Sequence, residues 1–332
     1  MTTTLPETVN RARELVWPAL REAVDTLEPD LRAVAVQHFG WDEDGASGGK
    51  AVRPALTLAS AAAVGAPPET AVDGAVAVEL VHNFSLLHDD IMDRDEERHH
   101  RPTAWTVFGE ARAILAGDAL ANLATQVILR RGTAEATWAA SMLADATARM
   151  IAGQSEDMSR EGRIGVRIEE VVAMHAAKTG ALLSCSSAIG AVLAGSDEEV
   201  VQRLASFGIQ VGIAFQAVDD QLGIWGRPEL TGKPRWNDLR QRKSSLPVVA
   251  ALDTQCVEAD RLRELLSQPE RTEEEIAEAA ELVEACGGRQ FAADEAERRL
   301  TLALKELDRA QIEPAARDEL EGLARFIVER EF

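Results

Sequence analysis

Two groups of aspartates carry most of the chemistry that this sequence suggests. Asp89, Asp90 and Asp93 end one apolar segment, and Asp219 and Asp220 end another. Carboxylates spaced i, i+1 and i+4 place two of the three on one face of a helix, where they repel one another. A hard divalent cation offsets this repulsion. Mg²⁺ is the first candidate because it takes few carboxylates and completes its shell with substrate phosphate oxygens. Two such groups predict one diphosphate held from two sides.

The rare lysines support a phosphate ligand. Only five of the 35 Lys and Arg residues are lysines. Lysine is a compact point charge and a common ligand of phosphate. Four of the five lie near the aspartates or in glycine-flanked stretches. We interpret these four as diphosphate ligands, with solvated surface lysines as the alternative: Lys50, Lys178, Lys233 and Lys243.

The net charge of −21 excludes several partners. No basic stripe is available to neutralise the phosphates of a nucleic acid or an anionic membrane surface. No apolar signal segment begins the sequence and no uncharged stretch reaches the length of a membrane span, so we expect a cytoplasmic protein without membrane insertion. Three cysteines without a CxxC pair predict reduced thiols. We favour a buried structural role for each: Cys185, Cys256 and Cys286.

The elements that must position these residues are helices. Alanine and leucine abound while aromatic residues make up 4%, which favours helix over sheet. Residues 69–93 and 200–225 are apolar nearly all round, as in the central helices of a bundle. We therefore predict one all-α domain over residues 1–332, with 1–5 flexible. Side by side, the two helices would bring both carboxylate groups to the mouth of a deep apolar well, which suits a charged head with a hydrocarbon tail.

Several separated motifs also occur in the order of a known family. The chain resembles the trans-isoprenyl diphosphate synthases (polyprenyl synthetases), and among them most closely the geranylgeranyl diphosphate synthases of actinobacteria. The resemblance runs from Gly48 to about Leu252, which is most of the chain. The motifs that carry it are Gly48-Gly49-Lys50-Ala51-Val52-Arg53-Pro54, His82 to Asp93, Arg98 to Thr103, Lys178-Thr179, Phe215 to Asp220 and Gly232 to Lys243.

The resemblance implies a bundle of long antiparallel helices that forms a homodimer. It implies the condensation of an allylic diphosphate with isopentenyl diphosphate into an all-trans product, geranylgeranyl diphosphate. Both aspartate groups would bind Mg²⁺, three ions in all, on the allylic diphosphate. The other implied roles are diphosphate binding by Arg98, Lys178, Lys233 and Lys243, isopentenyl diphosphate binding by Gly49, Lys50, Arg53, His82 and His99, and lining of the space near the developing carbocation by Thr179 and Gln216.

Phe84 is a candidate for setting the length of the product. It lies five residues before Asp89, over one helical turn down the presumed well, and the small Ser85 leaves the neighbouring wall open. Family members with an aromatic residue there imply short to medium products. An ordinary core phenylalanine is an equally good interpretation. His88, beside Asp89, invites the role of a base, but a packed histidine is the better interpretation.

Three positions depart from the family pattern. The second aspartate motif ends in a third Asp in the family, where this chain has Gly223, so we expect a weaker metal site. His99 replaces the second of two adjacent arginines and can donate one hydrogen bond but no bidentate pair. Trp236 replaces a smaller or tyrosyl residue, and the sequence offers no reason for it.

Two other functions stay open at this point. A class I terpene synthase on the same fold would ionise and cyclise a prenyl diphosphate without isopentenyl diphosphate. His99 favours that function, whereas Lys50, Arg53 and His82 oppose it. A weakly active regulatory subunit of another prenyl synthase is compatible with Gly223 and His99. The intact first aspartate motif and the four lysines disfavour that second alternative.

Overall fold

The chain is almost entirely helical, as the sequence predicts. The computed structural model describes residues 7–42, 51–98, 101–228 and 234–328. The flexibility expected of residues 1–5 therefore lies outside the described residues. The only strands in the described part are β1 (Glu97–Arg98) and β2 (Arg101–Pro102), which pair antiparallel in the polar loop after the first aspartate motif. A two-residue pairing is too short to leave an alternating hydrophobic pattern, so the sequence gives no sign of it.

Contacts divide the chain into two compact units, which are described separately. The first comprises residues 1–147, 182–206 and 306–326, and the second comprises 148–181, 207–305 and 327–332. Several helices contribute residues to both units. The single domain that we expect over residues 1–332 stays a prediction.

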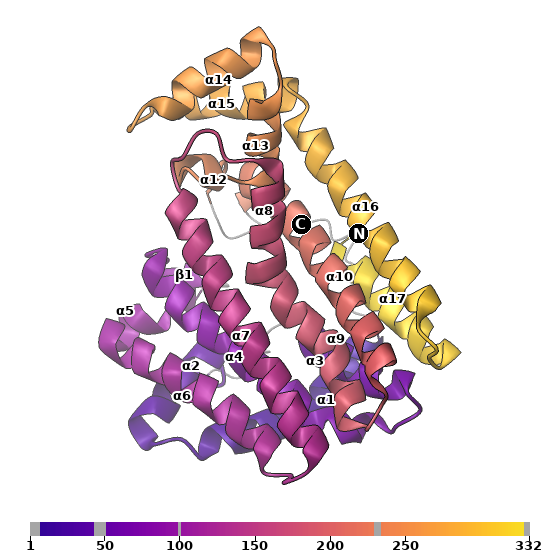
Figure 1. Ribbon diagram of the computed structural model, residues 1–332. Helices are drawn as coiled ribbons and strands as arrows, with labels where there is room; N and C mark the ends of the chain where they lie inside the picture. The colour runs from indigo at the N-terminus through magenta and orange to yellow at the C-terminus, as the bar shows by residue number, and fades with distance from the viewer. Residues whose placement is uncertain (1–6, 43–50, 99–100, 229–233, 329–332) are drawn as a thin grey trace. The chain divides into compact units, whose positions relative to one another are not determined.

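The first unit is built around the apolar helix that carries the first aspartate group. This helix, α4 (Val72–Met92), lies beside α6 (Glu110–Leu129) and packs on α3 (Val52–Ala63), as Figure 1 shows. Close backbone approach organises the rest of the core. A Cβ on Gly190 of α9 (Ala181–Leu193) would lie 2.1 Å from the carbonyl oxygen of Thr57 on α3. Only glycine at position 190 therefore lets α9 and α3 approach this closely. The elements of the first unit are α1 (Glu7–Asp25), α2 (Pro29–Phe39), α3 (Val52–Ala63), the 3₁₀ turn η1 (Pro68–Ala71), α4 (Val72–Met92), α5 (Ala104–Phe108), α6 (Glu110–Leu129), most of α9 (Ala181–Leu193), and parts of α7 (Ala134–Arg160) and α17 (Pro314–Val328).

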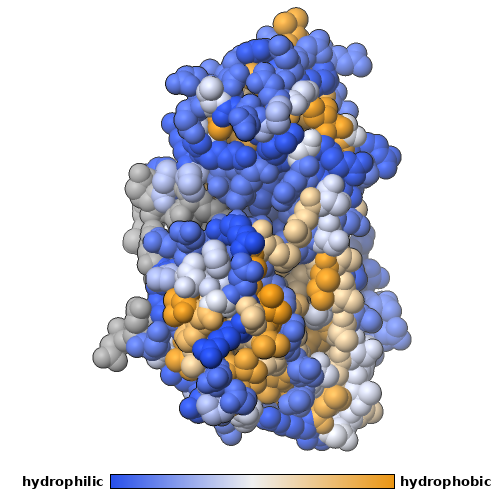
Figure 2. All heavy atoms as spheres, turned by 90° about the vertical axis from the view of Figure 1, so that its left-hand side faces the viewer, coloured by the Kyte–Doolittle hydropathy of each residue, from blue (hydrophilic) through white to orange (hydrophobic). Residues whose placement is uncertain are grey.

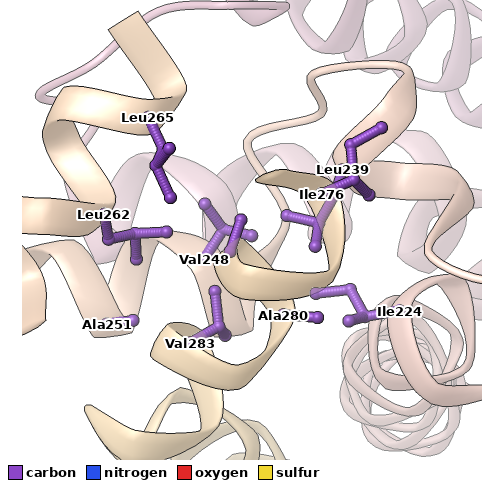
Figure 3. Close-up of a cluster of buried hydrophobic side chains, with 10 residues drawn as sticks. Ile224, Leu239, Val248, Ala251, Leu262, Leu265, Ile276, Ala280 and Val283 are labelled. Atoms are coloured by element: carbon purple, nitrogen blue, oxygen red, sulfur yellow. The ribbon is translucent and has the colours of Figure 1, made fainter. Parts of the chain in front are cut away.

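The second unit has its own apolar core. Ile224, Leu239, Val248, Leu262 and Val283 come from five helices and their side chains point toward one another (Figure 3). Trp236 packs against this cluster, which accounts for a residue that the sequence leaves unexplained. The elements are α8 (Ile168–His175), the π-helical turn η2 (Ala176–Gly180), most of α10 (Glu198–Trp225), α12 (Asn237–Arg240), α13 (Leu246–Asp253), α14 (Val257–Ser267), α15 (Glu273–Ala285) and most of α16 (Gly288–Arg309).

One helical segment has the length and composition of a membrane span. It covers Ile168–Leu193, and 78% of its apolar window is buried inside the protein. Core helices of globular proteins meet the same criteria, and burial of this extent is what a core helix shows.

The cysteines differ from one another in burial. Cys185 is buried, and burial raises the pKa of its thiol to about 12. Cys256 and Cys286 are partly exposed. The expected buried role is therefore confirmed for Cys185 and wrong for the other two, because they lie at helix ends rather than on buried helix faces.

Candidate active site

The first aspartate group lies at the carboxyl end of α4. Asp90 is 1% exposed, and its Oδ1 accepts a hydrogen bond from Arg98 Nε at 2.8 Å and faces Arg98 Nη2 at 2.6 Å. The β1–β2 hairpin thus places a guanidinium on the buried carboxylate. Asp89 and Asp93 are more exposed, and Asp93 caps the helix. Carboxylates at a helix carboxyl end meet the negative end of the dipole, which a bound cation would offset.

Phe84, over one turn before Asp89, forms a packed pair with His88, which directly precedes Asp89. Phe84 is buried, and its ring meets the His88 ring edge-on with centroids 4.9 Å apart. His88 Nε2 lies 3.1 Å from the Ile114 carbonyl oxygen of α6. Gly117 makes room for it, because a Cβ there would lie 2.4 Å from His88 Nε2. This placement supports the packed role of His88 over that of a base. Ser85 is half-buried, and its hydroxyl donates to the His82 carbonyl at 2.7 Å.

A buried acid supports Arg53 in the first turn of α3. Burial raises the pKa of Glu79, while the Arg53 guanidinium and the Asn83 amide lower it. Asn83 Nδ2 donates to Glu79 Oε1 at 3.2 Å, and Asn83 Oδ1 lies 3.1 Å from His38 Nε2. An acid inside the apolar stretch of α4 is the sequence signal for this network. A buried acid thus lies near Arg53, a residue for which the family resemblance implies isopentenyl diphosphate binding.

In the second unit, η2 presents Lys178 and Thr179. This π-helical turn lies between α8 and α9 (Ala181–Leu193), and such turns are frequent at functional sites. Two glycines bring neighbouring backbones against it. A Cβ on Gly153 of α7 would lie 2.3 Å from Lys178 N, and one on Gly212 of α10 would lie 2.4 Å from Gly180 Cα. Lys178 Nζ lies 2.5 Å from Asp157 Oδ2 on α7.

A chain of hydrogen bonds joins η2 to the second aspartate group. The Thr179 hydroxyl donates to Gln216 Oε1 at 2.8 Å, and Gln216 Nε2 donates to Asp220 Oδ1 at 3.1 Å. Asp220 Oδ2 accepts from the Leu246 backbone N–H at 2.7 Å and lies 3.2 Å from His175 Nε2.

These partners keep Asp220 ionised. It is 6% exposed, and burial alone would raise its pKa. The charge and proximity of His175, with the hydrogen bonds from Leu246 and Gln216, outweigh burial and hold the pKa of Asp220 below its usual value. Asp219 beside it is exposed. At both aspartate groups a buried, anchored carboxylate thus stands next to a more accessible one.

Gly223, the position that departs from the family, faces another carboxylate. A Cβ on Gly223 would lie 2.3 Å from Asp238 Oδ2. Asp238 is buried on α12, two residues after the N-cap Trp236, whose φ is 61°. A carboxylate from α12 therefore lies against the α10 position where the family carries its third aspartate.

Four of the expected site residues lie outside the described residues: Gly49, Lys50, His99 and Lys233. Lys243 follows α12 and lines a shallow surface pocket with Arg242 and Arg271. Within the described part of the chain, no three His, Cys, Asp or Glu side chains converge to bind a metal ion by themselves. Mg²⁺ that takes one or two carboxylates and phosphate oxygens needs no such set.

Four residues that contact the expected site could not be predicted from the sequence alone. Each is polar and contacts an expected site residue from another segment. Asp157 lies in a polar stretch of α7, and Asp238 lies in the motif from Gly232 to Lys243. These positions are a weak indication in the sequence that both residues belong to the site. The set comprises Glu79, Asp157, His175 and Asp238.

Comparison with known proteins decides the family. The sequence profile of the family described as polyprenyl synthetase matches residues 43–283. The chain belongs to the polyprenyl synthetase family. The (2E,6E)-farnesyl diphosphate synthase of Mycobacterium tuberculosis is 44% identical over 99% of this chain and 94% of its own length. The geranylgeranyl diphosphate synthase of the same organism is 40% identical over 97% and 93%.

Solved structures agree with this assignment. A polyprenyl synthetase from Streptomyces coelicolor A3(2) superposes with a TM-score of 0.91 at 50% identity, covering 98% of this chain and 99% of that one. The family recognised from the motifs and the all-α isoprenoid synthase fold are thereby confirmed. The chain is a prenyltransferase of the polyprenyl diphosphate synthase class. Its relatives include both farnesyl and geranylgeranyl enzymes, so the comparisons leave its product length open.

Proposed function

We propose that this polyprenyl synthetase uses Mg²⁺ to condense an allylic diphosphate with isopentenyl diphosphate, and that its product is all-trans geranylgeranyl diphosphate. One repeated arrangement carries the proposal. Asp90 is anchored by Arg98, and Asp220 by Gln216 and a backbone N–H, and each stands beside an accessible aspartate. Fixed carboxylates beside accessible ones are suited to hard cations that also bind phosphate oxygens.

The donor set fits Mg²⁺. Asp89, Asp93 and Asp219 offer hard oxygen ligands that are at least partly exposed. Three ions are expected from the family, held by these residues with Asp90 and Asp220. When bound, the metal neutralises the charge that develops on the leaving diphosphate.

The protein's own cations complete that stabilisation. Lys178 has three N–H donors, so it can keep its contact with Asp157 and still donate to a phosphate oxygen. Arg98 retains further N–H groups after binding Asp90. Lys233 and Lys243 are proposed to join them on the diphosphate. Donors held in place before reaction stabilise leaving-group charge most effectively.

Two polar oxygens are proposed to face the allylic carbon. The Thr179 hydroxyl donates its hydrogen bond to Gln216 Oε1, which leaves the lone pairs of the hydroxyl oxygen for a neighbouring positive charge. Loss of diphosphate leaves such a charge on the substrate, and the double bond of isopentenyl diphosphate attacks it. The departing diphosphate can remove the proton, so no side-chain base is required. We propose that Gly49, Lys50, Arg53, His82 and His99 hold isopentenyl diphosphate.

One incubation separates this function from its rivals. Purified protein with Mg²⁺ and an allylic diphosphate is incubated with and without isopentenyl diphosphate, and the products are dephosphorylated and chromatographed. Longer prenyl alcohols only with isopentenyl diphosphate support the proposal. A cyclic hydrocarbon formed without it would assign a terpene synthase. No product from any primer would assign a regulatory subunit.

A second copy of this chain is the partner that we propose. Large apolar side chains lie exposed on α5 and α6, among them Val107, Ile114 and Leu115, the last with 55% of its surface accessible. Figure 2 shows hydrophobic side chains gathered over this side of the molecule. Light scattering of the purified protein tests the homodimer. Leu115→Glu should shift it toward monomer, whereas Val257→Glu, on an even more exposed apolar residue of α14, should not.

A further inference from the structure

Two cysteines far from the aspartate motifs in sequence meet in the second unit. Cys256 Sγ and Cys286 Sγ lie 3.6 Å apart, although 30 residues separate them in the chain. Cys256 is the N-cap of α14, and Cys286 is the C-cap of α15. Both are partly exposed and reduced. A disulfide bond is about 2.05 Å long, so the sulfurs need to approach by about 1.5 Å.

The two thiols have different environments. The Thr254 hydroxyl and the Ala259 backbone N–H lower the pKa of Cys256. The Thr254 hydroxyl also donates to the Ala251 carbonyl at 2.7 Å. A thiolate at a helix amino end is further stabilised by the dipole. Burial and the neighbouring sulfur raise the pKa of Cys286. Cys256 is therefore the more reactive partner.

The surrounding structure holds the pair in place. Helices α14 and α15 pack against each other through Leu262, Leu265 and Val283 (Figure 3). Cys286 itself packs against this cluster. The packing of α14 against α15 around this apolar cluster therefore holds the two cysteines close together. No contact in the proposed prenyl transfer uses either cysteine.

We propose that Cys256 and Cys286 form a reversible disulfide when the protein meets a peroxide. The Cys256 thiolate attacks one peroxide oxygen, the O–O bond breaks, and a sulfenic acid and water result. The Cys286 sulfur then attacks the sulfenic sulfur, the S–O bond breaks, and a second water leaves with the thiol proton. The first water takes up the proton that Cys256 releases when its thiolate forms, so the two thiols together lose two protons and two electrons, and one peroxide becomes two waters. A dithiol reductant reverses the bond.

Tryptic peptide mapping tests this directly. The full-length protein is treated with hydrogen peroxide, unfolded in denaturant so that every thiol is accessible, alkylated without reduction, digested and analysed by mass spectrometry. Cleavage places Cys256 in residues 244–261, Cys286 in 272–289 and Cys185 in 179–203. We expect the first two peptides to be joined with the loss of two hydrogens, and to separate after dithiothreitol. The buried Cys185 is the internal control and should stay fully alkylatable.

Single variants test the order of attack. In Cys286→Ser, Cys256 should accumulate as a sulfenic acid that dimedone traps, at least several-fold more than Cys286 does in Cys256→Ser. Three free thiols after peroxide treatment, or overoxidation of Cys256 without the joined peptide, would overturn the disulfide. Equal trapping in the two variants would overturn the assigned roles. These readouts do not depend on prenyl transfer.

Discussion

Gly223→Ala should destabilise the protein, although glycine-to-alanine changes inside helices normally stabilise. Gly223 lies on α10, and a Cβ there would lie 2.3 Å from both Asp238 Cγ and Asp238 Oδ2. Ordinary carbon–oxygen contact begins more than an ångström further out. Asp238 is buried on α12, so its carboxylate has to give way within a packed region.

The magnitude follows from two opposing effects. An alanine in a helix interior gains about 0.5–1 kcal/mol over glycine because the unfolded chain loses freedom. Forcing an extra methyl group into a packed site costs about 1–3 kcal/mol. We expect a net loss of about 1–2 kcal/mol in the free energy of unfolding. At about 2–4 °C per kcal/mol for a folded region of this size, Tm should fall by about 2–8 °C.

Thermal unfolding followed by circular dichroism measures this change. Gly322→Ala is the matched control, because Gly322 is an exposed glycine within α17 with nothing within 4 Å of its Cβ position. That variant should be as stable as the parent or slightly more stable. Asp238→Ala should relieve the clash, so the penalty of Gly223→Ala should shrink in the double variant. The reasoning is refuted if Gly223→Ala and Gly322→Ala have the same stabilising effect.

Activity offers a second readout of the same clash. Gly223→Asp restores the residue that the family carries there, and chemical analogy alone predicts a stronger metal site. We expect lower turnover instead, because the new side chain must displace Asp238 and sets two carboxylates against each other. A variant with higher kcat at limiting Mg²⁺ would show that the site relaxes and that Asp238 is no substitute for the missing aspartate.

Three further predictions concern the proposed reaction. Asp89→Ala or Asp90→Ala should each lower kcat by about a hundredfold or more, because the leaving-group charge loses its metal; near-normal turnover would remove the metal assignment. His99→Arg should lower KM for isopentenyl diphosphate by restoring a bidentate phosphate donor, and an unchanged or higher KM would assign His99 a role of its own. Phe84→Ala should lengthen the product by roughly one isoprene unit, since it opens a ring's volume if the wall does not collapse; an unchanged chromatogram from a folded variant would place the floor of the well elsewhere, on the helices of residues 105–124.

Local features of the sequence determined the larger part of this description. Helix periodicity depends only on neighbouring residues, so α4 and α10 were predictable within a few residues, and so was the position of each aspartate group at a helix end. The order of the motifs was sufficient for the family. Phe84 could be placed one turn before Asp89 for the same reason, because the pitch of a helix is fixed by its backbone.

Only the tertiary structure decided which groups anchor those residues. Lys178 meets Asp157, and Gly223 meets Asp238, because glycines elsewhere let particular backbones approach. Such approaches depend on the summed packing of many side chains, and no local pattern encodes them. For the same reason, the proximity of Cys256 and Cys286 could not be predicted from the sequence. Spacing suggests three unrelated thiols, whereas packing of α14 against α15 brings Cys256 and Cys286 to within 3.6 Å.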